Sequence, residues 1–287
     1  MIIVTGATGQ LGGRIVESLL ARIPAERVGV SVRDPRRAQH LAERGVRVRQ
    51  GSFTDPDSLT HAFEGADQVL IVSVDKLGAE AVRQHRVAID AAVAARARRI
   101  LYTSHMGAAP DSRFEPCRDH ATDETALQAC GVPFTSLRNG FYAASAMRFF
   151  GQAAATGQLV LPADGAVSWT AHADLADAAA AILTEDGEFD GPTPPLTAAQ
   201  AIDFDQIAAL AAELTGRSIE RITVSDEQFR QQMIDHGAPP AQADMMIDIF
   251  AAGRAGEFAT VDPTLATLIG REPTGFDTVL REALSAS

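Results

Sequence analysis

Three glycines near the start of the chain have a spacing that suits the binding of a phosphate group. They follow an apolar run at residues 2–4, and a helical pattern of apolar residues begins at residue 10. A strand, a glycine turn and a helix start present backbone N–H groups and the helix dipole to an anion. Gly6 would allow the turn, Gly9 the approach of a pyrophosphate, and Gly12 close packing of the helix.

The spacing Gly-x-x-Gly-x-x-Gly differs from the commoner Gly-x-Gly-x-x-Gly, so the position directly after an apolar strand carries the prediction. A glycine turn of purely structural use is the alternative. We predict a dinucleotide site, and its contacts are expected from six consecutive residues. These are Gly6, Ala7, Thr8, Gly9, Gln10 and Leu11.

Arg33 ends the second expected strand, where the adenine ribose of a dinucleotide should lie. An arginine there suits a 2′-phosphate, and Arg36 or Arg37 could add to its charge. The sequence therefore favours NADP(H) over NAD(H). Asp34 is the complication, because its carboxylate could instead hold a free 2′-hydroxyl, and Arg33 could be only a solvated turn residue.

Other polar residues follow the later strands of the same pattern. Ser73 and Val74 end the fourth strand, and Thr103 and Ser104 end the fifth. We expect these four residues to border the nicotinamide half of the cofactor, because ligands bind at the carboxyl ends of such strands. Asp55 could reach the adenine edge, or it could only cap the next helix. The sequence leaves both roles open.

His120 stands near the start of the helix after the fifth strand, with Glu124 one turn on. Histidine can donate a proton or a hydrogen bond near neutral pH, and Glu124 could orient the ring. We expect His120 to contact the cofactor rather than to act as an acid. The alternative is an ordinary surface pair of histidine and glutamate.

Some constellations are missing or weak. Tyr102 and Tyr142 are the only tyrosines, and neither has a lysine four residues on, so that device for carbonyl reduction is excluded. Ser104 and His105 are adjacent, so they should point to opposite faces of a strand, which argues against a hydrolase. Cys117 could be a reactive thiol, but nothing near it indicates a lowered pKa. No metal-ligand spacing is present.

The elements that position these residues follow from the hydrophobic pattern up to residue 139. Strands and helices alternate strictly, which predicts right-handed crossovers and a parallel sheet covered on both faces, with strand order 3-2-1-4-5-6. The strands are expected at residues 2–4, 27–32, 46–49, 66–74, 99–104 and 133–138. Helices are expected at residues 10–21, 79–95 and 118–130, and from residues 34 and 55 onward.

The remaining half is expected to be mostly helical and to have no parallel sheet of its own. A linker is predicted at residues 190–195, where glycine and proline are dense. Beyond it, helices are expected at residues 204–214, 226–236, 241–252 and 276–284, and short strands at 159–161 and 219–224.

The predicted fold class is α/β, a Rossmann-like doubly wound parallel sheet with a smaller, mostly helical C-terminal substrate-binding part. We expect a dinucleotide-binding domain at residues 1–155, with residues 170–185 packing back on it. Residues 186–287 would form a smaller domain that caps the substrate.

The totals agree with a soluble enzyme of this class. The chain has 287 residues and a formal net charge of −12, which argues against direct nucleic-acid binding. Its two cysteines fit a reducing compartment. No apolar run is long enough to cross a bilayer and no leader precedes the first strand, so a cytoplasmic location is expected.

These features together resemble the NmrA-like group of atypical short-chain dehydrogenases, and within it most closely the bacterial type 2 NAD(P)H:quinone oxidoreductases. The resemblance covers nearly the whole chain, and the combination with residues 137–142 makes it specific. The motifs that carry it lie at residues 4–12, 32–35, 84–86, 102–104, 137–142, 173–174 and 268–271.

The resemblance implies NADPH across the glycine turn and a nicotinamide contact from His120, at a place where some relatives carry lysine. It implies that Asn139, Gly140, Phe141 and Tyr142 border a quinone pocket, with His120 and Asn139 as the catalytic pair. In this family hydride passes directly to the quinone without a dedicated acid. The loop at residues 106–117 departs from the family pattern, and Phe141 stands where an indole is familiar.

Two other functions stay open. Some NmrA-like proteins bind the dinucleotide without turnover and signal its redox state to a protein partner. A reductase of aromatic dyes or phenylpropanoid compounds would differ only in its acceptor. A homodimer is also possible.

Overall fold

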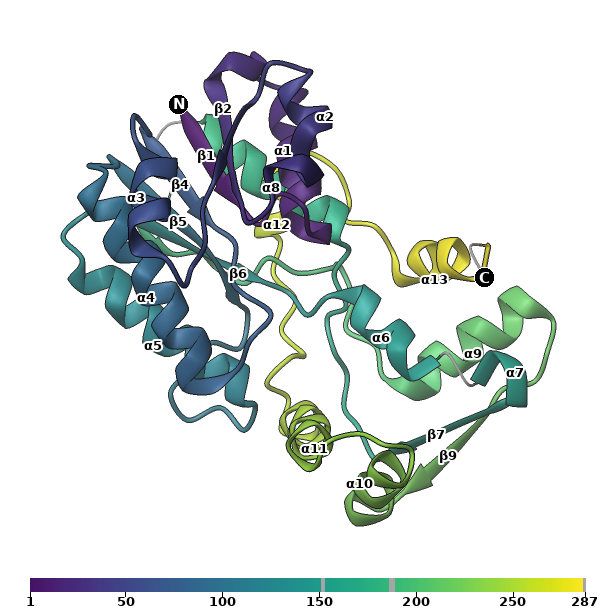
Figure 1. The fold of residues 1–287 in the computed structure, drawn as a ribbon. Helices are drawn as coiled ribbons and strands as arrows, with labels where there is room; N and C mark the ends of the chain where they lie inside the picture. Colours follow the sequence, from purple (N-terminus) through teal and green to yellow (C-terminus); the bar gives the residue numbers. More distant parts are fainter. Residues whose placement is uncertain (151–152, 186–188, 286–287) are drawn as a thin grey trace.

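The computed structural model describes residues 1–150, 153–185 and 189–285. A parallel sheet with helices on both faces forms the larger part of the molecule, and a smaller, mostly helical part lies beside the carboxyl edge of this sheet (Figure 1). The predicted α/β class is therefore confirmed.

Within the described residues, seven strands form the main sheet in the order β3-β2-β1-β4-β5-β6-β8, and all neighbouring pairs are parallel. The predicted order 3-2-1-4-5-6 is confirmed, and a seventh strand is added. The strands are β1 (Ile2–Thr5), β2 (Val28–Val32), β3 (Arg47–Gln50), β4 (Gln68–Ile71), β5 (Arg99–His105), β6 (Phe134–Asn139) and β8 (Gly191–Pro192).

Strand β8 lies where the sequence analysis places a linker. Gly191 and Pro192 pair with Thr135 and Ser136 of β6, and the next residues continue along the same edge, where Leu196 N–H donates to the Arg138 carbonyl. The linker prediction was wrong because a sheet edge tolerates proline, which lacks the N–H that a central strand needs.

Alternate residues of the central strands pack into two separate cores, one on each face of the sheet. Both faces are buried, which explains the near-continuous apolar runs of these strands. Val4 and Leu101 pack in one core with helices α1, α8 and α12, whereas Ile3 and Ile100 pack in the other with α3, α4 and α5. The helices of the two faces are α1 (Gln10–Leu20), α8 (His172–Thr184), α12 (Thr264–Ile269), α3 (Pro56–Phe63), α4 (Gly78–Ala94) and α5 (Glu115–Ala129). Three shorter helical segments are η1 (Ala25–Arg27), η2 (Pro35–Ala38) and α2 (Gln39–Ala42).

Two helices differ from their predictions. Helix α5 begins at Glu115, three residues before the predicted start, because Pro116 occupies the first helical turn, where its missing N–H costs nothing. Helix α12 was not predicted. It is short and ends at Gly270, which adopts the left-handed conformation with φ +68°.

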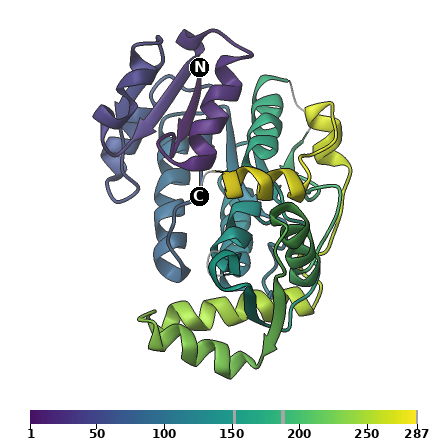
Figure 2. The ribbon, with the colours of Figure 1, turned by 90° about the vertical axis from the view of Figure 1, so that its right-hand side faces the viewer.

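The smaller part is built from helices around a third apolar core (Figure 2). It also holds a two-stranded parallel sheet, β7 (Gln158–Pro162) with β9 (Glu220–Val224), so the expectation of no parallel sheet here was wrong. Pairing of strands this far apart in sequence leaves no local signal. Its helices are α6 (Ala143–Phe150), α7 (Ala153–Thr156), α9 (Phe204–Thr215), α10 (Asp226–Asp235), α11 (Pro240–Arg254) and α13 (Phe276–Ser285).

A buried carboxylate of α8 binds the C-terminal segment to the large part of the molecule. Asp174 of α8 is fully buried and accepts hydrogen bonds from Thr274 N–H (2.6 Å) and the Thr274 hydroxyl (3.1 Å). Arg271 pairs with the same carboxylate at 2.6 Å. Two of the motifs that carry the family resemblance therefore meet in space. In the described part of the chain no helix is long and apolar enough to span a membrane.

Candidate functional site

The glycine turn joins β1 to α1 at the carboxyl edge of the sheet. Gly6 has φ +65°, which only glycine adopts at little cost, and its carbonyl accepts a hydrogen bond from Gly9 N–H at 2.9 Å. A Cβ on Gly12 would lie 2.3 Å from the Gly6 carbonyl oxygen, so this position must be glycine for the helix to pack. Thr8, Gly9 and Gln10 are exposed and available to a ligand.

The other two predicted contacts of the turn are core residues. The side chains of Ala7 and Leu11 are 5% and 6% exposed and pack in the core shared with α1 and α8. They can therefore meet a cofactor only through their backbone atoms.

Arg33 directly follows β2, the neighbour of β1, and its side chain is exposed with no hydrogen-bond or ion-pair partner among the described residues. Asp34 is committed elsewhere. Arg36 binds both of its carboxylate oxygens at 2.9 Å, which lowers the pKa of Asp34, and Asp34 also caps the Arg36 N–H. Asp34, which could have favoured a free 2′-hydroxyl, is thus paired with Arg36. Arg33 has no such ion-pair partner among the described residues.

Asp55 caps helix α3. Its carboxylate accepts a hydrogen bond from Ser58 N–H at 3.2 Å. The capping role that the sequence left open is therefore present, and contact with the adenine stays a prediction.

The ends of β4 and β5 are tied together beside the glycine turn. The Thr103 hydroxyl accepts from Ser73 N–H at 2.8 Å and donates to the Ser73 hydroxyl at 3.2 Å. Val74 N–H donates to Nε2 of His85 at 2.9 Å. Ser104 differs from these three residues, because its buried hydroxyl donates to Glu124 on the α5 side of the sheet. Only its backbone can face a cofactor.

A buried chain of hydrogen bonds supports His120. Its Nδ1 lies 2.7 Å from the Tyr102 hydroxyl, which donates to the Asp123 carboxylate at 2.9 Å. Nδ1 of His85 lies 2.7 Å from the same carboxylate. Because Nε2 of His85 accepts from Val74, its Nδ1 carries the proton and donates to Asp123.

The expected pairing of His120 with Glu124 is wrong. Glu124 is held by Arg138 at 2.6 Å and accepts from the hydroxyls of Ser104 and Ser136. The stronger cation on β6 competes for this carboxylate, so Tyr102 takes the place of Glu124 as the partner of His120.

Burial lowers the pKa of His120 well below the ordinary value, and the nearby His105 and His85 lower it further. His120 is therefore neutral at physiological pH. Since the Tyr102 proton goes to Asp123, His120 donates from Nδ1 and keeps a lone pair on Nε2. Burial and the Asp123 charge raise the pKa of Tyr102 well above its ordinary value, so this hydroxyl stays protonated.

The residues expected around the acceptor follow β6. Asn139 is 2% exposed, and its buried Oδ1 has no hydrogen-bond partner among the described residues. The ring of Phe141 meets Trp169 edge to face with centroids 5.2 Å apart, and Tyr142 lies on His172 at 4.3 Å. Gly140 is buried, and a Cβ there would lie 2.2 Å from the Thr170 hydroxyl, so close packing alone accounts for this glycine.

Three residues of this arrangement were not predicted as part of the site: His85, Tyr102 and Asp123. From the sequence, Tyr102 was considered only as a tyrosine without a lysine four residues on. The role of all three residues depends on contacts between β5, α4 and α5, which the sequence does not encode locally. The tyrosine within the buried apolar run of β5 is the one available signal.

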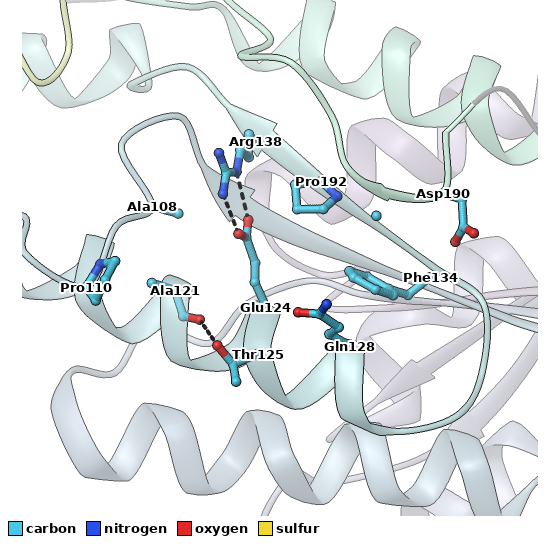
Figure 3. Close-up of a pocket in the computed structure, with 11 residues that line it drawn as sticks. Ala108, Pro110, Ala121, Glu124, Thr125, Gln128, Phe134, Arg138, Asp190 and Pro192 are labelled. Atoms are coloured by element: carbon cyan, nitrogen blue, oxygen red, sulfur yellow. Dashed lines mark hydrogen bonds and ion pairs between the residues drawn. The ribbon is translucent and has the colours of Figure 1, made fainter.

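A separate cavity lies between α5, β6 and β8 (Figure 3). The Glu124–Arg138 pair forms part of its wall, and Gln128, Phe134 and Pro192 also line it. None of the predicted site residues lines this cavity. In the described part of the chain no group of three or more His, Cys, Asp or Glu residues could hold a metal ion.

The fold and the glycine-turn site define a Rossmann-like dinucleotide-binding protein, and comparison with known proteins gives the family. Residues 1–276 match the NmrA-like family, to which the chain belongs. It is 35% identical over 286 residues to quinone oxidoreductase 2 of Escherichia coli, covering 99% of this chain and 98% of the relative. It is 29% identical to the NAD(P)H azoreductase of Xenophilus azovorans, covering 96% and 95%.

Solved structures agree with this assignment. The E. coli quinone oxidoreductase QOR2 complexed with NADPH superposes with a TM-score of 0.93 at 32% identity, covering 99% of this chain and all of the other. The triphenylmethane reductase of Citrobacter sp. complexed with NADP(H) gives a TM-score of 0.91 at 31% identity over 99% of this chain and 100% of that one.

Proposed function

We propose that this protein is an NADPH-dependent oxidoreductase that transfers hydride to a quinone or a similar small aromatic acceptor. One observation carries the proposal: an exposed glycine turn and an uncommitted Arg33 stand at the ends of the neighbouring strands β1 and β2. The names of the relatives support the same cofactor and acceptor class.

The residues present fit NADPH. Backbone N–H groups of the turn from Gly6 to Leu11, apart from the Gly9 N–H that bonds the Gly6 carbonyl, would hold the pyrophosphate at the start of α1. Arg33 would pair with the 2′-phosphate. Ser73, Val74 and Thr103 would border the nicotinamide, since their strands end at the same edge. The bound cofactor supplies the hydride, and the protein supplies position and an environment without bulk water.

His120 would position the nicotinamide without acting as an acid. Its low pKa leaves the ring neutral, and its Nδ1 is already engaged with Tyr102. A quinone that accepts hydride can take its proton from water, so no enzyme acid is required. Asn139, Phe141 and Tyr142 would border the acceptor, with Asn139 the second residue at the reacting group.

We also propose the finer features of this function. Residues 1–155 would bind the dinucleotide, and residues 186–287 would cap the acceptor. The protein would act in the cytoplasm and could form a homodimer. Its net charge of −12 favours the absence of direct nucleic-acid contact.

Oxidation of NADPH against a panel of quinones, followed by absorbance, tests this function. The proposal expects turnover with NADPH that clearly exceeds turnover with NADH. Tight NADPH binding without turnover of any quinone would favour a sensor that acts through a protein partner. Turnover of azo or triphenylmethane dyes alone would retain the enzyme and change its acceptor.

A further inference from the structure

Two buried polar atoms at the carboxyl edge of the sheet have no hydrogen-bond partner among the described residues. They are Nε2 of His105 and Oδ1 of Asn139. The two residues end β5 and β6 and are register partners, and Met106 N–H donates to the Asn139 carbonyl at 2.8 Å. Buried polar groups are nearly always paired, so two unpaired ones side by side require an explanation.

The unpaired nitrogen of His105 is a donor. Gly107 N–H donates to Nδ1 at 3.0 Å, and the Cys117 sulfur lies 3.2 Å from the same nitrogen. Nδ1 therefore carries a lone pair, and the neutral ring holds its proton on Nε2. Burial lowers the pKa of His105 to about 4, and burial raises the pKa of Cys117 to about 12. The pair is thus a neutral imidazole and a neutral thiol, not a nucleophile and base.

The unpaired atom of Asn139 is an acceptor. Its Oδ1 is buried and has no hydrogen-bond partner among the described residues. A hydroxyl or carbonyl oxygen placed between the two residues could accept from His105. Once it carried a proton, the same oxygen could donate to Asn139.

Aromatic rings pack around the His105 ring. The His105 ring meets Phe141, Phe258 and Phe114 edge to face, with centroids 5.2, 5.4 and 6.2 Å apart. It also lies nearly parallel to His120, at 18° and 6.3 Å. Such rings suit a planar ligand, and the unpaired Nε2–H of His105 suits one oxygen on that ligand. Entry of the ligand requires one of these edge contacts to open.

We propose that His105 orients the acceptor by donating a hydrogen bond from Nε2 to a carbonyl oxygen, with Asn139 Oδ1 accepting from the hydroxyl that replaces it. This inference rests on the proposed function and narrows the acceptor class to carbonyl-bearing rings such as para-quinones. In the reaction the quinone gains a hydride from NADPH and a proton from water, giving hydroquinone and NADP⁺. His105 neither gains nor loses a proton.

Two substitutions separate the roles of the ring nitrogens. His105→Asn keeps an acceptor near Nδ1 for Gly107 and removes the donor at Nε2. His105→Gln places an amide N–H near Nε2 and serves as the matched control. Each variant is compared with wild type for a para-quinone and for a cationic triphenylmethane dye that has no carbonyl group.

The proposal expects His105→Asn to lower kcat/KM for the quinone about tenfold or more, mainly through KM, and to leave the dye nearly unaffected. His105→Gln should retain most of the quinone activity. Equal losses for quinone and dye, or no loss for either, would overturn the role of His105 while leaving the proposed function intact.

A binding measurement separates the failure of this inference from the failure of the proposed function. Trp169 is the only tryptophan and packs on Phe141, so quenching of its fluorescence reports quinone binding to the NADP⁺ complex without turnover. Binding that weakens in His105→Asn, without turnover in wild type, would keep the hydrogen bond and reject the reductase. Binding unchanged by the substitution would reject the hydrogen bond.

The inference stays testable if His105→Asn fails to fold. In wild type labelled with ¹⁵N-histidine, a para-quinone added to the NADP⁺ complex should shift the Nε2–H signal of His105. An unchanged signal at saturating quinone would contradict the proposal.

Discussion

At the scale of residues, the structure gives His120 a different hydrogen-bond partner from the one that the sequence suggested. His120 lies on Tyr102 rather than on Glu124, and Asp123 holds Tyr102 and His85 together. Residue types and spacing could identify His120 as a candidate. They could not show that Tyr102 rather than Glu124 contacts it, because Arg138 of a different strand holds Glu124.

Replacement of His120 tests whether it positions the cofactor or donates a proton. We expect His120→Ala to weaken NADPH binding or raise KM, with a modest loss in kcat, because the neutral ring is no acid. General acid catalysis would contribute roughly 10²–10⁴-fold. A kcat loss of that size with unchanged cofactor affinity would show that His120 is the acid.

Replacement of Arg33 tests the choice of cofactor. Arg33→Ala should cost NADPH binding about 1.5–3 kcal/mol, the range for a charge-assisted contact, and leave NADH nearly unchanged. Both dissociation constants can be measured by calorimetry. Arg22→Ala is the matched control, since Arg22 is also exposed but follows the far end of α1. Equal losses for both cofactors would reject the assignment of Arg33.

The buried His105 predicts a pH dependence of stability. Its pKa of about 4 in the folded protein lies below the ordinary 6.5, so the unfolded chain binds more protons between these values. Stability is therefore full above about pH 6.5 and falls as the pH drops toward 4. From pH 7 to pH 5 this residue alone should cost about 2 kcal/mol.

Urea denaturation of the ligand-free protein at these two pH values measures this loss. His105→Asn has no titrating ring and should lose about 2 kcal/mol less than wild type over the same interval. His120 is present in both proteins, but His105 contributes to its lowered pKa, so the difference reports His105 together with its effect on His120. Identical losses in both proteins would show that His105 titrates normally in the fold.

At the scale of elements, the sequence predicted best where one period repeats. The strands of the main sheet, helix α4 and the glycine turn follow strong local patterns, and their order follows from the handedness of the crossovers. Strand β8 was missed because it is short and contains proline. Strands were predicted at the positions of β7 and β9, but their parallel pairing was missed because the two are distant in sequence.

The glycine turn makes different demands at two of its positions. A side chain on Gly9 would approach the Gly6 carbonyl to 3.3 Å, whereas one on Gly12 would meet it at 2.3 Å. Gly9→Val should abolish NADPH binding and leave the melting temperature of the ligand-free protein close to wild type. Gly12→Ala should lower that temperature markedly. Calorimetry measures NADPH binding and the melting temperature of both variants. If Gly9→Val still bound NADPH, the dinucleotide would lie elsewhere.

At the scale of the whole molecule, the C-terminal half is joined to the large part by packing and by hydrogen bonds. Helix α12 packs against α8 on the main sheet, and Asp174 fixes Thr274 and Arg271 to this face. Several of the remaining C-terminal helices share one core with apolar residues such as Met106, Phe141 and Trp169. The aromatic rings around His105 therefore combine both halves, since Phe258 follows α11 and Phe114 precedes α5.

The central claim is transfer of hydride from NADPH to a quinone. Anaerobic mixing of the protein with NADPH and a para-quinone, with hydroquinone measured by chromatography, tests it most directly. The account predicts one hydroquinone formed for each NADPH oxidised, at a rate that depends on the protein. NADPH that binds tightly and stays reduced in the presence of every quinone tested would contradict it.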